Sequence, residues 1–395
     1  MVRVLKLVNF KSHRDTTIEL NNLTILCGSN GVGKSSIIQI LLLLREAFIK
    51  DKSFDILDLK SNPVKVGTAN DAIYEFGEFD GIKIDLTFDE KLNCNFCYEA
   101  STEIERVKSF LSLNKGKTIK NEQFDIYNPS LIQQNFGKIS LFNVAFQYIS
   151  AARKGPLESY PKDDKIVDVF RQISVIEGQA EYFAHFLDRY RNEDVLDAIC
   201  RLENEPFKDL YTQVLLWEKY IFDGASANLQ DVGKLGYVLK FSFDVEEGVR
   251  KKTADYDAKN VGFGLTYVLP LLIAILSSKK DSIVIIENPE AHLHPGGIAR
   301  LTELICIAAQ AGVQMIIETH SDHVINGVLV QSKKFEDTKG QIGIFRENIS
   351  IYQFDRNDSN HSTVATRIIV EEDGRVYDKP AGFFDQIAID LRELI

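Results

Sequence analysis

The residues best suited to chemistry lie in a glycine-rich stretch, GSNGVGKSS, at positions 28–36. Gly28, Gly33, Lys34 and Ser35 hold the fixed places of the pattern G-x-x-x-x-G-K-[ST], between an apolar strand and an apolar helix. Glycines allow left-handed turns that aim successive N–H groups at phosphate oxygens, and the start of the helix adds positive charge. The lysine then reaches the outer phosphates and the hydroxyl ligates magnesium, so the stretch predicts a nucleotide site.

A second chemical motif is SIVIIENPEAHLHP at 282–295, in which an aliphatic run ends in an acid. Glu287 holds the place where phosphate-handling enzymes present a carboxylate to magnesium. A second acid that activates water usually follows, but here Asn288 does. An amide can orient water but cannot accept its proton. Glu290 is the next acid, so we expect weak hydrolysis in which Glu290 activates or positions the water.

Apolar periodicity predicts the elements that position these motifs. Strands are expected at 2–10, 15–20, 23–28, 83–88, 93–100, 138–150 and 235–243, with a long helix at about 34–50 and helical spacing over 166–222. From 260 onward, helices at 264–277, 298–310 and after 320 alternate with strands at 283–287 and 314–319, which is typical of a parallel sheet. The tail is expected to form short strands over 349–378 and then a final helix.

Composition limits the class of protein. The chain has 395 residues, of which 45% are hydrophobic and 26% charged, values typical of a globular protein. The net charge of -11 argues against a uniformly basic nucleic-acid surface but leaves a local basic patch open. No apolar run approaches the roughly 18 residues that span a bilayer, and the N-terminus lacks a signal-peptide core. We therefore expect a cytoplasmic protein with no membrane partner.

Four stretches together carry a family resemblance. VLKLVNFKSHRDTTIEL before LTILCGSNGVGKSS resembles the start of SMC-like and RecF-like ATP-binding heads, and NVGFGLTYVLPLL at 260–272 resembles their signature stretch. IVIIENPEAHLHP resembles their second acidic motif, and MIIETHSDHVING at 315–327 their switch-histidine motif. Their order and spacing resemble an ABC-type ATPase of the OLD-like, bacterial defence-associated kind. The ending DGRVYDKPAGFFDQ resembles the C-terminal cap of one subgroup.

The resemblance implies an α/β fold with an ABC-type ATPase head. Such a head is a mixed sheet around a phosphate-loop core, here with an inserted helical subdomain and a small C-terminal α+β cap. We expect four parts in chain order: an N-terminal ATPase lobe at 1–100, an inserted mixed and helical subdomain at 101–230, a C-terminal ATPase lobe at 231–345 and the cap at 346–395.

The same resemblance implies roles for individual residues. The phosphates of ATP would be held by Asn30, Gly31, Gly33, Lys34, Ser35 and Ser36, and the base and ribose would lie near Lys11, Ser12 and His13. Magnesium would be held by Ser35 and, through water, by Glu287. His320 would contact the γ-phosphate. A second copy's γ-phosphate would be capped by Asn260, Gly262 and Gly264, which implies a head-to-head homodimer or a higher homo-oligomer.

Some residues leave alternatives open. No glutamine occurs at 58–77, where a lobe-joining Gln is expected, and Gln39 would pack or face the lobe junction. Arg153 either touches phosphate or the dimer partner, or is a solvent-facing loop residue. Metal binding is the weaker interpretation of two further groups, because neither has zinc-site spacing: the CxxC pair Cys94 and Cys97, and the histidines His292, His294, His320 and His323.

The resemblance also implies an output. Many OLD-like ATPases carry a C-terminal Toprim nuclease, but about 65 residues follow the switch motif here, too few for that unit. We therefore expect a separate effector, a nuclease or toxin, controlled by an ATP-driven dimerising switch in anti-phage defence. Two alternatives stay open: a RecF-like ATP-dependent DNA-binding repair protein, and a nucleotide-gated scaffold with negligible turnover.

Overall fold

The computed structural model describes residues 1–89, 92–100, 108–113, 135–201, 207–245, 251–377 and 392–393. Within these ranges the helices are α1 (Lys34–Asp51), α2 (Ala69–Ala72), α5 (Phe183–Arg189), α6 (Leu210–Ile221), α7 (Phe263–Leu276), α8 (Pro295–Gln310) and α9 (Asp322–Asp337). None of these helices has both the length and the hydropathy needed to cross a bilayer.

A central sheet carries the chemical motifs. Its order is β15-β14-β3-β13-β12-β8, from β3 (Leu23–Gly28), β8 (Phe146–Ile149), β12 (Ile283–Glu287), β13 (Gln314–Thr319), β14 (Ile349–Arg356) and β15 (Thr363–Ile368). Neighbouring strands are parallel except β14 and β15, which are antiparallel. Because parallel strands end at the same edge, the phosphate loop after β3, the acid of β12 and the histidine after β13 meet there.

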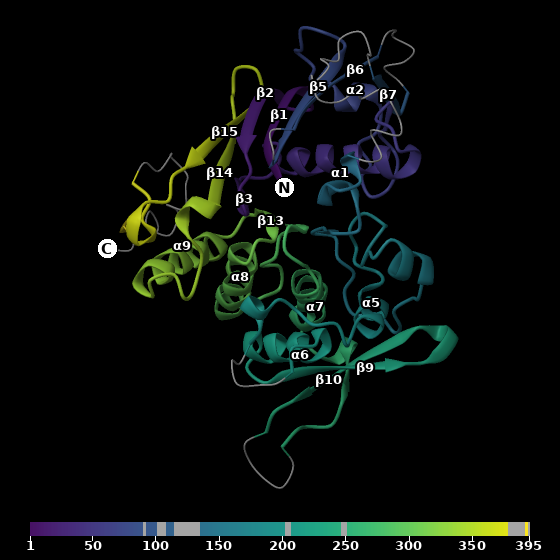
Figure 1. Cartoon of the computed structure of the whole chain (residues 1–395), viewed down its shortest axis with the longest axis vertical. Coiled ribbons are helices and arrows are strands. Elements are labelled where there is room, and N and C mark those ends of the chain that lie inside the picture. The colour runs from purple at the N-terminus through teal and green to yellow at the C-terminus, as the bar shows by residue number, and fades with distance from the viewer. Residues whose placement is uncertain are drawn as a thin grey trace.

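Both faces of the central sheet are buried, which explains its continuous aliphatic strands. Along β12, Ile283 and Ile285 share a core with α1 and the N-terminal strands. Val284 and Ile286 share the opposite core with α5, α6, α7 and α8. Figure 1 shows α1 above β13, with α7, α8 and α6 below it. The phosphate loop is therefore anchored between two packed layers.

A second sheet, antiparallel, covers the outer side of α1. Its order is β2-β1-β5-β6-β7-β4, from β1 (Val2–Phe10), β2 (His13–Glu19), β4 (Ile56–Asp58), β5 (Gly81–Phe88), β6 (Asn93–Glu99) and β7 (Phe110–Leu113). A small sheet of β9 (Ala225–Asp231), β10 (Tyr237–Phe243) and β11 (Tyr256–Asp257) lies beyond α6 (Figure 1).

The structure corrects several predicted elements. The strand expected over 138–150 is wrong in its first part, because Ser140–Phe142 form a 3-10 turn and only Phe146–Ile149 pair with β12. The region 166–222 contains less α-helix than predicted, since Lys165–Val169 form a single π-helical turn. The expected final helix falls almost entirely outside the described residues.

The central sheet crosses the predicted domain boundaries. Its edge strand β8 comes from the expected insert at 101–230, and β14 and β15 come from the expected cap at 346–395. The division into four parts stays a prediction.

Candidate nucleotide site

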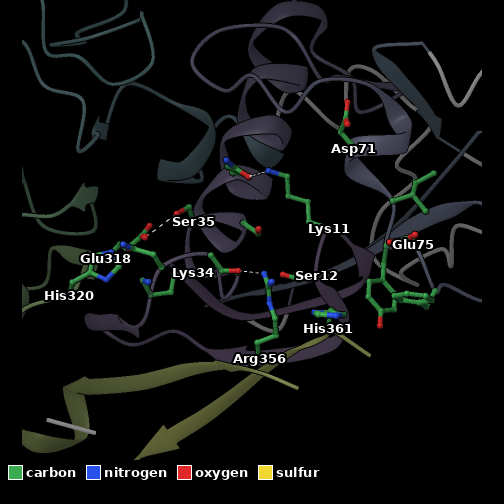
Figure 2. A pocket seen from close by; sticks show the side chains of 18 residues that line it. Lys11, Ser12, Lys34, Ser35, Asp71, Glu75, Glu318, His320, Arg356 and His361 are labelled. Atoms are coloured by element: carbon green, nitrogen blue, oxygen red, sulfur yellow. Dashed lines mark hydrogen bonds between the residues drawn. The ribbon is translucent and has the colours of Figure 1, made fainter. Parts of the chain in front are cut away.

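A cavity of about 580 Å³ opens beside the phosphate loop (Figure 2). Its size is typical of ligand pockets. It is lined by nine of the predicted site residues: Lys11, Ser12, Asn30, Gly31, Gly33, Lys34, Ser35, Ser36 and His320. Further walls come from the segment around α2 (Asp71, Tyr74, Glu75 and Phe76) and from the β14–β15 turn (Arg356 and His361). The structure thus gathers residues from five separate parts of the chain.

The phosphate loop has the backbone that its glycines predict. Gly28, Gly31 and Gly33 adopt φ angles of 133°, 77° and 105°, in the left-handed region. A Cβ atom on Gly28 would lie 2.2 Å from the carbonyl oxygen of Phe354, and one on Gly33 would lie 2.4 Å from Oγ1 of Thr363. A larger residue is therefore excluded at both positions, and the loop can keep its N–H groups turned toward a ligand.

Lys34 and Ser35 begin α1 beside the cavity. The ammonium of Lys34 donates to the carbonyl oxygens of Gly28 at 2.9 Å and Ser29 at 2.6 Å. Burial lowers the pKa of Lys34, and the nearby Glu318 carboxylate opposes that shift. The hydroxyl of Ser35 donates to Oε1 of Glu318 at 2.9 Å. This hydroxyl is the group that a nucleotide-bound cation would meet.

Glu318 is a cavity residue that the sequence analysis missed. It lies on β13 opposite Glu287 of β12, with which it is in register. Both oxygens of Glu287 are engaged: Oε1 accepts from the Tyr148 hydroxyl at 3.0 Å and Oε2 from the Ala151 N–H at 3.2 Å. The signal was present, because two neighbouring apolar runs each end with an acid.

The two acids lie in a poorly solvated environment. Burial raises the pKa of Glu318 to about 7, with a further increase from the charge of Glu287, while the Ser35 hydrogen bond and Lys34 lower it. Burial also raises the pKa of Glu287, against the hydrogen bonds from Ala151 and Tyr148. Two carboxylates that disfavour their own charge form a site that a cation would stabilise.

The loop after β12 contacts His320, which follows β13. Asn288 adopts a φ of 45°, and its N–H donates to the carbonyl of Glu318 at 2.8 Å. Oε1 of Glu290 accepts from the backbone N–H of His320 at 3.1 Å. Nδ1 of His320 lies 2.9 Å from the carbonyl oxygen of Gly28, and because a carbonyl only accepts, Nδ1 carries the proton. Burial lowers the pKa of His320 and favours the neutral ring.

Of the three residues expected near the base and ribose, two line the cavity and one does not. Lys11 and Ser12 line the cavity, but His13 is fully buried behind the loop. Its Nε2 donates to the Gly33 carbonyl at 3.0 Å and its Nδ1 lies 3.0 Å from the Thr16 hydroxyl. Burial lowers the pKa of His13 to about 4. His13 therefore braces the phosphate loop instead of lining the cavity, and the place of the base stays a prediction.

The strands β14 and β15 also hold the loop, which no local motif predicted. Oγ1 of Thr363 donates to the carbonyl of Val32 at 2.8 Å and pairs with the hydroxyl of Ser12 at 2.7 Å. The guanidinium of Arg356 donates to the carbonyl of Gly31 (Figure 2). The far end of the chain is thus part of the cavity wall.

The interpretation of Arg153 as a solvent-facing loop residue is wrong, since its side chain is buried and the residue is 2% exposed. Its guanidinium donates to the carbonyl oxygens of Ser150 at 2.9 Å, Glu287 at 2.7 Å and Asn288 at 2.8 Å, and lies over the ring of Tyr267 on α7. Arg153 therefore fixes the end of β12 from behind the cavity.

The structure also shows where Gln39 lies and how the residues considered for metal binding are arranged. Gln39 lines the cavity, where its Oε1 accepts from the Lys11 ammonium at 2.7 Å. Cys94 and Cys97 lie three residues apart on β6, so they point to opposite faces. In the part of the chain that the structure describes, no group of three or more His, Cys, Asp and Glu residues is arranged to hold a metal ion.

The signature residues lie away from this cavity, and none of the three is among the described residues that line it. Asn260 and Gly262 are exposed just before α7, and Gly262 is its N-cap. Gly264 is buried, and a Cβ atom on it would lie 2.5 Å from the carbonyl oxygen of His292. The first turn of α7 therefore packs against the loop that carries His292.

Comparison with known proteins agrees with this geometry. Residues 23–326 match the family described as "AAA domain, putative AbiEii toxin, Type IV TA system". Residues 344–394 match a family of unknown function, DUF3696. The Old nuclease of Escherichia phage P2 is 22% identical over 345 residues, which cover 80% of this chain and 56% of that protein. The chain thus spans little more than half of this relative.

Solved structures share the fold. An SMC head bound to the C-winged helix domain of ScpA has a TM-score of 0.52 at 14% identity, covering 93% of this chain and 98% of that one. The SMC head of Pyrococcus yayanosii, with a coiled coil and joint, has a TM-score of 0.51 at 11% identity, covering 94% and 98%. The chain therefore belongs to the AAA-domain family named for the AbiEii toxin and has the head fold of ABC- and SMC-type ATPases.

Proposed function

We propose that the chain binds ATP with magnesium and hydrolyses it slowly. The observation that supports this best is the cavity in which Lys34, Ser35 and the glycine turns face the buried acid Glu318. The residues fit the ligand, because Gly31 and Gly33 have the left-handed φ angles that turn loop N–H groups toward phosphate, and Oε2 of Glu318 has no hydrogen-bond partner within the described ranges. Bound magnesium would neutralise charge between the phosphates.

In this proposal the chain's own residues act mainly by positioning. When ATP binds, the Lys34 ammonium donates to the outer phosphates in place of the carbonyl oxygens of Gly28 and Ser29. His320 contacts the γ-phosphate. Glu290 holds the backbone of His320, from where it positions or activates the water that Asn288 can only orient. Phosphoryl transfer depends more on positioning and charge neutralisation than on a base, so slow turnover is expected.

The role of Glu290 is tested by Glu290→Gln. We expect phosphate release to slow by about tenfold or more, with the affinity for ATPγS kept, because a general base is worth on the order of 10²-fold. Glu78→Gln, the same change at an exposed glutamate that is not among the described residues lining the cavity, serves as the control. Hydrolysis by Glu290→Gln at the wild-type rate would remove Glu290 from the proposal.

We propose that two copies close head to head around two ATP molecules. Asn260 and Gly262 are exposed at the N-terminus of α7, a place where backbone N–H groups favour an anion. Neither residue faces the chain's own cavity, so the phosphate they would cap belongs to a second copy. Hydrolysis or nucleotide release would reopen the dimer.

The proposed output is control of a separate effector, a nuclease or toxin, in anti-phage defence. The phage P2 relative is called a nuclease, and the family description names a toxin. One similar head was solved with a domain of a partner protein, ScpA, so a head of this fold can carry a second chain. Two alternatives remain, a RecF-like DNA-binding protein and a scaffold with negligible turnover.

The experiment is native mass spectrometry of the tagged protein isolated from its host with ATP and magnesium. A second protein in fixed ratio would support the effector proposal and identify the output. A dimer that retains nucleic acid, with an affinity that falls steeply with salt, would favour the RecF-like alternative. ATP-dependent dimers that release no phosphate would favour the scaffold.

A further inference from the structure

The carboxylate nearest the phosphate loop comes from an unexpected strand. Glu318 of β13 is 6% exposed and lines the cavity beside Lys34, Ser35 and His320 (Figure 2). Its Oε1 accepts the Ser35 hydrogen bond, whereas Oε2 is buried without a partner among the described residues. A buried, unpartnered carboxylate oxygen is costly, and such an atom on a ligand cavity points to a missing positive partner.

Glu287, which occupies the expected place on β12, is differently situated. Its two oxygens are held by the Tyr148 hydroxyl and the Ala151 N–H, and it is not among the described residues that line the cavity. The Glu287 side chain is thus satisfied by its own neighbours.

We propose that Glu318, rather than Glu287, is the carboxylate that holds the nucleotide-bound divalent cation together with Ser35. This inference rests on the proposed ATP site and deepens it. The Ser35 hydroxyl uses its single proton on Glu318, which leaves its lone pairs for the cation. The partnerless Oε2 supplies the compensating negative charge. A cation shared with phosphates and waters needs only one or two protein ligands, so no cluster of three is required.

The proposal explains the unusual neighbour of Glu287. If Glu318 of β13 holds the cation, Glu287 is not needed as the magnesium ligand. The residue after it, Asn288, then need not be the acid that activates water. Asn288 can then serve as a structural connector, since its N–H donates to the carbonyl of Glu318 and its carbonyl accepts from Arg153. The proposed cation ligand, Glu318, thus lies on β13, which is adjacent to β3 and the phosphate loop. The expected ligand, Glu287, lies on β12, one strand further away.

The test measures how magnesium changes nucleotide affinity, without turnover. The Kd of ATPγS is determined by calorimetry with magnesium and with EDTA for the wild type, Glu318→Gln and Glu287→Gln. We expect magnesium to tighten wild-type binding by about tenfold or more. Glu318→Gln should lose most of this gain, and Glu287→Gln should keep most of it. Mn²⁺ titration followed by electron paramagnetic resonance gives an independent readout.

Two further variants keep the test decisive. Glu78→Gln removes the same charge from an exposed glutamate that is not among the described residues lining the cavity, and it should keep the full magnesium effect. Glu318→Asp keeps the charge and should retain part of the effect, even if Glu318→Gln fails to fold. A loss confined to Glu287→Gln, or equal in both glutamine variants, would overturn the assignment. A wild type that binds no ATPγS would instead refute the ATP site itself.

Discussion

The phosphate-loop cavity and the signature surface differ in how completely one chain builds them. At the cavity, the loop is braced by His13 from β2, by Thr363 and Arg356 from the far end of the chain, and by Glu318 from β13. At the signature surface, Asn260 and Gly262 stand exposed before α7, and a Cβ atom on Gly262 would meet nothing within 4 Å. The cavity is completed by residues of its own chain, whereas the signature surface is exposed, and we propose that a second copy binds there.

The largest expected effect is a loss of ATP affinity, and it should arise at the cavity and not at the signature surface. Lys34→Ala should weaken ATP affinity by about 100- to 1000-fold, because the ammonium supplies charge-assisted hydrogen bonds to the phosphates. Lys50→Ala, at the exposed end of the same helix, is the control and should bind normally. Fluorescent ATP titration of the monomer is the measurement. Normal affinity in Lys34→Ala would mean that the cavity is not the ATP site.

Arg153 connects the two regions and should matter for stability. It ties the end of β12 to Tyr267 of α7, so Arg153→Ala leaves three buried or partly buried carbonyl groups without their donor. We expect the free energy of unfolding to fall by about 3 kcal/mol, measured by urea denaturation. Arg14→Ala, at an exposed arginine, is the control. A stability unchanged by Arg153→Ala would contradict this bridging role.

The brace at His13 should make the cavity side sensitive to acid. Its pKa of about 4 in the folded chain lies below the unfolded value of 6.5, so its stabilising effect is full above pH 6.5. That effect is lost as the pH falls toward 4, by about 2–3 kcal/mol, because only the unfolded chain takes up the proton over that range. His13→Asn should show a smaller fall, whereas His361→Asn, at an exposed histidine, should not differ from the wild type. The free energy of unfolding is measured by urea denaturation at pH values from 7 to 4. An equal dependence on pH in the two variants would contradict the stabilising role of His13.

The smallest expected effect concerns the open surface. Gly262 has an ordinary φ of -60° and free space, so Gly262→Asp should fold normally but place a negative charge where a second copy's phosphate is proposed to lie. We expect ATP-induced dimers and hydrolysis to fall by about tenfold, with unchanged ATP affinity in the monomer. Gly262→Asn, of equal size without the charge, is the matched control. If both variants dimerise like the wild type, the signature surface is not the interface.

Much of the central sheet was predictable because its strands carry local signals. The expected strands at 283–287 and 314–319 are confirmed, since continuous aliphatic runs bounded by polar residues mark strands buried on both faces. The strand expected at 138–150 was mostly wrong, because apolar residues there fill the core from a 3-10 turn as well as from β8. Periodicity alone does not distinguish the two.

The sequence determined the phosphate loop by itself, because glycine conformations, a lysine and a hydroxyl at the start of a helix are local properties of consecutive residues. It also placed Glu287 and His320 at strand ends. Only the tertiary structure decided that His13 turns away from the cavity and that Glu318 turns into it, because these orientations depend on which strands lie side by side. Strand order is set by packing between residues hundreds of positions apart, and no local pattern carries that information.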